Sequence, residues 1–321
     1  MTRKTVTVFS ATGTVGIACV EELIRQERFD VCVLARKSGQ QEKSTTGLLT
    51  GADAKQKQYA DWQARGVEVK WVDATYHGEL IPALEGTNYL VSCVPYNAAE
   101  SQYPLIWAAK EAGVERFVPS EFGAIYEFEQ FWQTPNSHRA MARQKAFIRR
   151  VIELAGLDFT IVAAGLWPEY YMLEPVAVMG DGDVPVAWST GIDVGRIIPH
   201  LLAHPASRNA ICPVAATAYC SWNDMLAVME KVMGRKVERF YPDAKYWKTA
   251  YDRSEPGSVM HILLAIGIAL TDTPAGMSLF GNWNKTFIPE FKGTPLDEVV
   301  RDRIEPFVAA MTAAGAAYPR P

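Results

Sequence analysis

Hydrophobic and polar positions follow two different periods along the first half of the chain. Short, nearly continuous apolar runs predict β-strands at residues 5–10, 31–35, 67–72, 89–94, 116–120 and 159–165. Apolar residues recur at helical spacing between several of these runs, at residues 14–26, 101–113 and 142–156. Because uninterrupted apolar strands are typical of parallel sheets covered on both faces, the pattern predicts an α/β fold with a Rossmann-type, doubly wound parallel sheet.

The pattern changes after about residue 165, where proline, glycine and aromatic residues become frequent and the expected elements shorten. We therefore expect one domain over residues 1–165 and a smaller α/β region over residues 166–321, from which segments can cross back to the sheet. Residues 221–234 predict a helix in this second region, with Ser221 as its N-cap.

The composition excludes several classes of protein. The formal net charge is −4, so no basic surplus predicts nucleic-acid binding. The longest apolar run, residues 261–270, is too short for a membrane span, which takes about 20 residues. No hydrophobic signal segment precedes the first strand, and we expect a cytoplasmic protein. No Cys-x-x-Cys pair occurs, so neither a disulfide framework nor a metal site is expected from Cys19, Cys32, Cys93, Cys212 and Cys220.

The stretch FSATGTVG (9–16) joins the first predicted strand to the first predicted helix. Gly13 can let a pyrophosphate approach the backbone, and Gly16 can let the helix pack closely, while the helix N-terminus attracts the anion. Ser10 replaces the first glycine of the usual motif, and a serine can occupy that turn if its φ stays negative. The alternative is a glycine-rich turn without a ligand. The expected cofactor contacts in this stretch are Ser10, Thr12, Gly13, Thr14, Val15 and Gly16.

The end of the second predicted strand indicates which dinucleotide binds. An NAD site usually carries an acidic residue there, but this strand ends in Arg36 and Lys37. Two cations favour the 2′-phosphate of NADPH through charge-assisted hydrogen bonds. A solvated surface pair is the alternative interpretation.

Several motifs together resemble one family. The stretches ATGTVG (11–16), VERFVPSEFG (114–123) and KAFIRRVIELAGLDFTIVAAGLWPEYY (145–171) are similar to the isoflavone reductase-like group of NmrA-type atypical short-chain reductases. That group includes phenylcoumaran benzylic ether reductases and pinoresinol-lariciresinol reductases. The likeness extends to about residue 245, and the stretch from Pro256 onward looks more like fungal relatives.

The resemblance implies roles for individual residues. Lys145 matches the catalytic lysine of the family and Phe122 the aromatic residue beside the nicotinamide. Lys55, which we place in a polar surface loop over residues 38–57, matches a lysine that assists the cofactor phosphate. Further cofactor contacts are expected from Val94, Pro95 and Ser120. Substrate contacts are expected from Phe122, Trp167, Tyr170 and Tyr171.

The chemistry differs from that of ordinary short-chain dehydrogenases, which pair a tyrosine with a lysine four residues later. Met141 stands at the tyrosine position, so Lys145 itself must supply or relay protons. The alternative is a surface lysine on an amphipathic helix. The literal match Tyr241 to Lys245 contains a proline and is interpreted as coincidence. His138 is interpreted as a loop residue, and a substrate contact is its alternative.

These observations predict an NADPH-dependent reductase that transfers hydride to an aromatic or phenolic secondary metabolite. The aromatic cluster after residue 165 suits a flat substrate, and a hinge core is its alternative. A non-catalytic NmrA-like sensor of the NADP redox state is the alternative function, and a nucleotide-sugar epimerase is disfavoured by the missing tyrosine. We expect a small aromatic molecule as partner, and a monomer or a homodimer.

Overall fold

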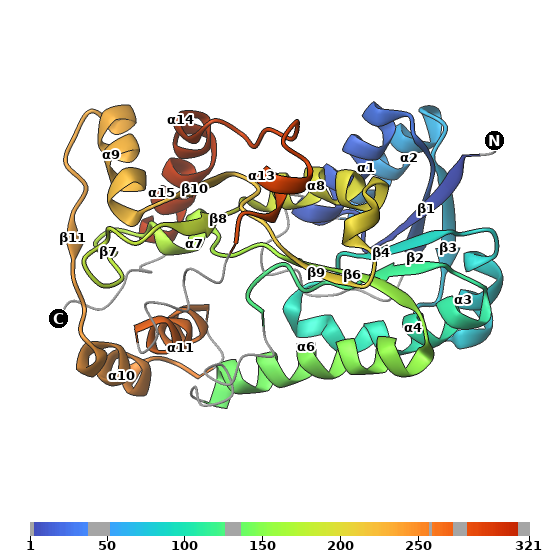
Figure 1. Cartoon of the computed structure of the whole chain (residues 1–321), viewed down its shortest axis with the longest axis horizontal. Helices are drawn as coiled ribbons and strands as arrows, with labels where there is room; N and C mark the ends of the chain where they lie inside the picture. The colour runs from blue at the N-terminus through green and yellow to red at the C-terminus, as the bar shows by residue number, and fades with distance from the viewer. Residues whose placement is uncertain (1–2, 38–51, 126–135, 257–258, 272–280, 314–321) are drawn as a thin grey trace. The chain divides into compact units, whose positions relative to one another are not determined.

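A parallel sheet with strand order β3-β2-β1-β4-β5-β6-β9 organises the first of two units in the structure (Figure 1). Its first six positions follow the 3-2-1-4-5-6 order of doubly wound dinucleotide-binding sheets. The predicted α/β fold of Rossmann type is therefore confirmed.

The computed structural model describes residues 3–37, 52–125, 136–256, 259–271 and 281–313. Unit 1 comprises Met1–Phe122, Gln144–Val162 and Gly191–Cys212. Unit 2 comprises Gly123–Arg143, Ala163–Thr190 and Pro213–Pro321. Residues 191–212 thus return to unit 1 after the chain has entered unit 2.

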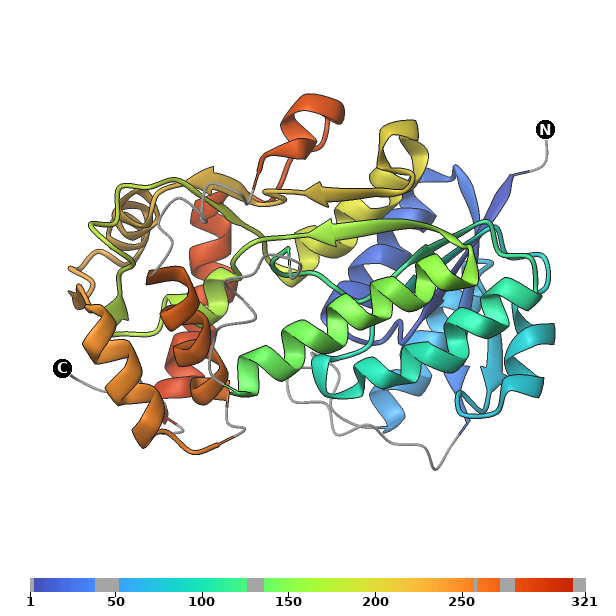
Figure 2. The same cartoon turned by 60° about the horizontal axis from the view of Figure 1, so that its bottom comes forward.

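The helices and strands of the sheet region are β1 (Lys4–Phe9), α1 (Thr14–Gln26), β2 (Phe29–Arg36), α2 (Ala52–Ala64), β3 (Glu68–Val72), α3 (His77–Leu84), β4 (Tyr89–Ser92), a 3₁₀ turn (Tyr96–Ser101), α4 (Gln102–Glu111), β5 (Arg116–Val118), α6 (Asn136–Ala155), β6 (Asp158–Ala163), α8 (Gly191–Ala203), a second 3₁₀ turn (Pro205–Ser207) and β9 (Ala210–Pro213). Side chains of α3, α4 and α6 pack in one core with Phe9, Leu34, Leu90 and Phe117 of the strands. Helices α1 and α8 lie together on the opposite face (Figures 1 and 2). Both faces of the sheet are therefore covered, as its uninterrupted apolar strands require.

Two predictions of local structure in this region are wrong. Residues 52–57, predicted as the end of a polar loop, belong to α2, because Tyr59 and Trp62 give this helix a buried side that its polar composition hides. Residues 38–51 of that predicted loop lie outside the described residues. Helix α6 begins at Asn136 rather than at residue 142, so His138 lies in a helix and not in a loop.

Unit 2 is built from short elements around one apolar core. They are α7 (Pro168–Tyr171), β7 (Val176–Ala177), β8 (Val186–Trp188), β10 (Ala218–Cys220), α9 (Trp222–Met233), β11 (Arg239–Phe240), α10 (Ala244–Arg253), α11 (Val259–Thr271), α13 (Trp283–Phe287), α14 (Leu296–Val299), a π-helical stretch (Val300–Ile304) and α15 (Glu305–Ala313). The predicted cap of α9 is confirmed: Ser221 accepts from the Asp224 backbone, and the Asp224 carboxylate accepts from Ser221 in return. Gly234 ends this helix at a φ of +65°, which favours glycine.

Candidate functional site

The turn between β1 and α1 has the shape of an anion-binding turn. A Cβ at Gly16 would lie 2.6 Å from the Ala11 carbonyl oxygen, so only glycine lets the helix begin this close to the turn. A Cβ at Gly13 would meet, among the described residues, nothing nearer than the Ser10 carbonyl oxygen at 4.0 Å. The side of the turn at Gly13 is therefore open, and that at Gly16 is closed.

Ser10 does not meet the condition of a negative φ, because its φ is +60°. The turn keeps the left-handed backbone conformation for which glycine is usual at this position, and Ser10 adopts that conformation. A non-glycine residue in this region costs about 1–2 kcal/mol. Such strain is typical of ligand-binding turns, where the surrounding structure holds it in place.

Helix α1 offers its first N–H groups at this turn. Gly13 is its N-cap, and no side chain in the described part of the chain caps the helix. The backbone donors of Thr14, Val15 and Gly16 and the positive end of the helix dipole are suited to a phosphate. The predicted contacts of these residues are thus compatible with the geometry and stay predictions.

Arg36 and Lys37 end β2 in different surroundings. The Arg36 guanidinium lies 5.2 Å from the centre of the Phe9 ring, directly before the turn. The Lys37 Nζ donates to the Glu79 carboxylate at 2.6 Å in an exposed ion pair. Lys55 lies half-buried on α2. Arg36 is therefore held beside the turn, whereas Lys37 is shared with an acidic side chain.

Tyr59 is a residue of this region that the sequence did not indicate. Its ring is 8% exposed on α2. Burial raises the pKa of its hydroxyl, and a hydrogen bond with the Thr12 side chain of the turn opposes this rise. The contact joins residues 47 positions apart, and no motif marks it.

The ends of β4 and β5 bring Val94, Pro95 and Ser120 together. The Ser120 hydroxyl donates to the Val94 carbonyl oxygen at 2.6 Å, and the Ser120 backbone N–H donates to the Gln102 side chain at 2.9 Å. Pro95 is the N-cap of the 3₁₀ turn that leads into α4. These three predicted contacts lie at the same carboxyl edge of the sheet as the β1–α1 turn.

Lys145 contacts the backbone of Glu121, the residue directly before Phe122. The Lys145 Nζ, on a side chain of α6 that is 8% exposed, donates to the Glu121 carbonyl oxygen at 2.5 Å. Phe122 follows with a φ of +32°, an unusual value for a bulky residue. The Arg149 guanidinium, one helical turn after Lys145, donates to the Glu121 carboxylate from Nη2 at 2.8 Å and from Nε at 3.2 Å. Glu121, which stands within the quoted stretch 114–123, and Arg149 were not among the predicted site residues.

The described residues of unit 1 fit a phosphorylated dinucleotide. The open turn at Gly13, the uncapped N-terminus of α1 and the guanidinium of Arg36 are donors of the kind that its phosphates need. No cluster of three or more His, Cys, Asp or Glu side chains in the described residues could hold a metal ion.

The predicted substrate residues after β6 lie in unit 2. The rings of Trp167 and Tyr170 are stacked with centroids 6.1 Å apart, and both are half-buried. Tyr170 also meets Phe307 edge-on at 5.5 Å. Tyr171 is only 5% exposed and packs against Trp222 in the core of the unit. Trp167 and Tyr170 are therefore better placed than Tyr171 to contact a ligand.

Tyr241 and Lys245 do not form a helical pair of the dehydrogenase type. Tyr241 is exposed before α10, and Lys245 lies within that helix, which Asp243 caps. Among the described helices, none is long and apolar enough to cross a membrane.

Sequence comparison relates the chain to plant reductases. The model of the NmrA-like family matches residues 2–262. Phenylcoumaran benzylic ether reductase 1 of Arabidopsis thaliana is 26% identical over 326 residues, which cover 95% of this chain and 100% of that protein. Isoflavone reductase of Pisum sativum is 26% identical over 254 residues, which cover 75% and 79% of the two chains. The first match continues past residue 245, so the expected end of the likeness there is wrong.

Solved structures share the fold over almost the whole chain. AtPrR2 with NADP⁺ and (+)-pinoresinol matches with a TM-score of 0.79 at 19% identity, over 94% of this chain and 99% of that one. An isoflavone reductase crystal structure matches with a TM-score of 0.76 at 22% identity, with the same coverage. The binary complex of leucoanthocyanidin reductase and NADPH from Vitis vinifera matches with a TM-score of 0.74 at 21% identity, again with this coverage.

Proposed function

Because this chain belongs to the NmrA-like family, we propose that it is an NADPH-dependent reductase of an aromatic or phenolic metabolite. Proteins that match it include isoflavone reductases and phenylcoumaran benzylic ether reductases, and matching structures hold NADP⁺ or NADPH. The observation that carries the proposal is a buried lysine, Lys145, at the carboxyl edge of the sheet that also bears the β1–α1 turn.

In this proposal the residues of unit 1 bind the cofactor. The first N–H groups of α1 bind the pyrophosphate, and Arg36 binds the 2′-phosphate with a charge-assisted hydrogen bond. Phe122 packs against the nicotinamide. NADPH, when bound, supplies a hydride to an electrophilic carbon of the substrate.

Lys145 acts as the acid or base. Each reduction also needs one proton, which is delivered to the substrate oxygen that gains electrons. The Glu121 carbonyl fixes the direction of one N–H bond of the ammonium, so the other two are oriented by the same contact. A positioned proton donor of this kind contributes roughly 10²–10⁴-fold to the rate.

Oxidation of NADPH with a panel of phenolic and quinone-like substrates tests the reductase proposal. Lys145→Ala is expected to lower kcat on a true substrate by roughly 10²–10⁴-fold. NADPH affinity should stay within a few fold, because the β1–α1 turn and Arg36 hold the phosphates. Lys110→Ala is a matched control, since this lysine is exposed on α4.

Two outcomes would contradict the proposal. Wild-type turnover in Lys145→Ala would remove the lysine from the mechanism. Tight NADPH binding without turnover of any phenolic substrate would favour the redox sensor instead.

A further inference from the structure

Two cations of α6 reach the same acidic residue in different ways. Lys145 binds the backbone carbonyl of Glu121, and Arg149 binds its carboxylate. All three residues are buried, with exposed fractions of 8% for Lys145, 5% for Arg149 and 1% for Glu121. Because Lys145 and Arg149 are four residues apart, they lie on one face of the helix.

This ion pair is not explained by stability alone. Removing a carboxylate and a guanidinium from water is expensive, and well-packed apolar residues often replace such a pair without loss of stability. In contrast, a pair of this kind fixes the direction of both side chains through hydrogen bonds. The Nε and Nη2 atoms of Arg149 both donate to one oxygen, Oε2 of Glu121.

The residue that the pair fixes lies in a strained turn. Glu121 donates its backbone N–H to the Pro119 carbonyl at 2.9 Å, and Phe122 follows with a φ of +32°. Strain of this sort persists only when the surrounding contacts determine the backbone strongly. The Arg149 contact is one such constraint on Glu121, whose carbonyl oxygen accepts the hydrogen bond from Lys145.

We propose that Arg149 is a positioning residue, which orients Lys145 by holding the Glu121 carboxylate and with it the turn from Pro119 to Phe122. Its catalytic consequence rests on the proposed reductase function. Arg149 touches neither substrate nor cofactor in this proposal. Arg149 fixes the position of the Glu121 carbonyl, to which the Lys145 ammonium donates. It also pairs with the Glu121 carboxylate, which would otherwise attract that ammonium.

Removing one charge of the pair or the other should move the titration of Lys145 in opposite directions. Glu121, from the segment after β5, and Arg149 and Lys145, both from α6, are charged groups of unit 1 at this turn. Helix α4 places Gln102 at this turn. Its side chain is a neutral amide that accepts a hydrogen bond from the Ser120 backbone N–H. Without Arg149, the remaining carboxylate stabilises the Lys145 ammonium and moves its titration to higher pH. Without Glu121, the remaining guanidinium moves it to lower pH.

The experiment compares Arg149→Met, Glu121→Gln, the double variant Arg149→Met/Glu121→Gln and Arg149→Lys in the full chain. Lysines are labelled by reductive ¹³C-methylation, and the Lys145 signal is identified by its absence in Lys145→Arg. We expect the titration midpoint of this signal to rise by about one pH unit in Arg149→Met, to fall by about one in Glu121→Gln and to return near the wild-type value in the double variant. Arg150→Met is the matched control, because Arg150 pairs with Glu153 on the exposed side of the same helix.

Kinetics supply the second readout. On a true substrate, Arg149→Met and the double variant should lower kcat by on the order of 10–100-fold, since a small misplacement of a catalytic group has effects of that size. KM and NADPH affinity should stay within about threefold. Arg149→Lys should restore part of kcat, because it keeps the charge and loses the guanidinium fork.

Each outcome decides the proposal. Midpoints that shift in the same direction in the two single variants, or not at all, would overturn it, as would wild-type kcat in the double variant. If Arg149→Met does not fold, the double variant and Arg149→Lys carry the test through their thermal unfolding, midpoints and kcat. The midpoints need no substrate, so opposite shifts without any turnover would support the positioning role and contradict the reductase function.

Discussion

Arg36 is the residue on which the choice of cofactor depends. Its guanidinium lies over Phe9 at the end of β2, whereas the neighbouring Lys37 is paired with Glu79. We expect Arg36→Ala to weaken NADPH binding by ~1.5–3 kcal/mol, the scale of one charged hydrogen bond, and to leave NADH binding nearly unchanged. Fluorescence titration of both cofactors measures this difference.

Lys37→Ala serves as the comparison for Arg36→Ala. Lys37 must leave the Glu79 carboxylate before it can bind a phosphate, so its removal should weaken NADPH binding less. Equal affinities of the wild-type protein for NADPH and NADH would refute the assignment of the 2′-phosphate site.

Site residues that a sequence motif marks differ in one physical respect from those that only the folded structure brings together. Gly16 and Lys145 could be predicted because a local spacing or a family motif marks them. Arg149 could not, because its partner Glu121 lies 28 residues away and nothing in the sequence pairs them. The positive φ of Ser10 could not be predicted either. A motif records which residue types occur, and it does not show whether the turn changes its backbone conformation or the serine adopts the strained one.

Helices α1 and α8 are the elements that carry the phosphate turn and its support. A Cβ at Gly195 on α8 would lie 2.3 Å from the Val15 carbonyl oxygen and 2.6 Å from the Ala18 Cβ, so the two helices meet at their backbones. The glycine in IDVGRI is thus explained by close helix packing. The strand and helix order of this region was predictable because its apolar periods are long and regular, whereas α2 was missed because only two aromatic residues mark its buried side.

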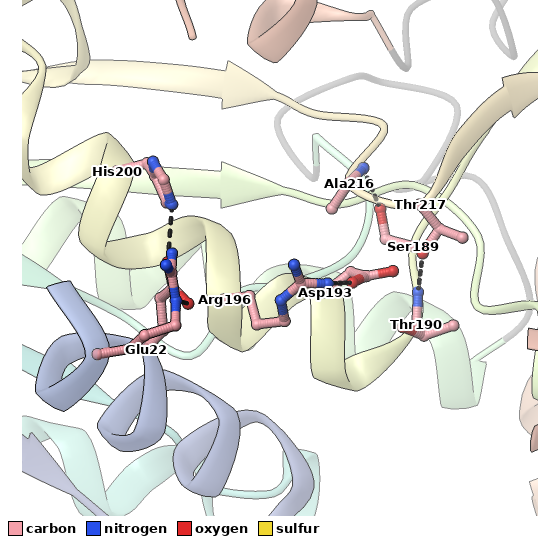
Figure 3. Close-up of polar contacts among 9 residues, drawn as sticks. Glu22, Ser189, Thr190, Asp193, Arg196, His200, Ala216 and Thr217 are labelled. Atoms are coloured by element: carbon pink, nitrogen blue, oxygen red, sulfur yellow. Dashed lines mark hydrogen bonds and ion pairs between the residues drawn. The ribbon is translucent and has the colours of Figure 1, made fainter. Parts of the chain in front are cut away.

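The same helix pair holds a buried carboxylate. Glu22 of α1 accepts from Arg25 at 2.6 Å and from Gln26 at 2.8 Å. It also pairs with His200 of α8 at 2.9 Å (Figure 3). In the first turn of α8, Asp193 accepts from Arg196 at 2.7 Å (Figure 3). Burial by itself raises the pKa of Glu22, but the hydrogen bonds from Arg25, Gln26 and His200 outweigh it and lower this pKa to about 2.

The lowered pKa of Glu22 predicts a specific loss of stability in acid. Because the pKa is lower in the folded than in the unfolded chain, the ionised carboxylate favours folding by at most about 3 kcal/mol. This contribution is complete above about pH 4.5 and disappears as the pH falls to about 2. Glu22→Gln should therefore be less stable than wild type at pH 6, and the difference should shrink toward pH 2 in urea unfolding.

Glu27→Gln is the matched control, because Glu27 is exposed directly after α1. Its unfolding free energy should follow that of the wild-type protein at every pH. A difference between wild type and Glu22→Gln that is independent of pH would mean that the charge of Glu22 does not contribute to folding.

On the scale of the whole molecule, the residues assigned to the cofactor and those assigned to the substrate belong to different units. Unit 1 contains the β1–α1 turn, Arg36 and Lys145, and unit 2 contains Trp167 and Tyr170. Parallel strands made the fold of unit 1 predictable. Unit 2 was harder to predict, because its strands have two or three residues and its core joins segments from Ala142 to Val308.

This division predicts that substrate affinity and cofactor affinity can be changed separately. Trp167 and Tyr170 present stacked, half-buried rings, and an aromatic ligand in contact with them gains ~0.5–1.5 kcal/mol beyond its buried area. Trp167→Ala or Tyr170→Ala should therefore raise KM for aromatic substrates by about threefold to tenfold and leave the NADPH affinity within about twofold. Tyr241→Ala, which removes an exposed ring of the same unit, should change neither constant. Reduction of small aliphatic carbonyls alone, or an unchanged KM in both variants, would show that these rings do not bind the substrate.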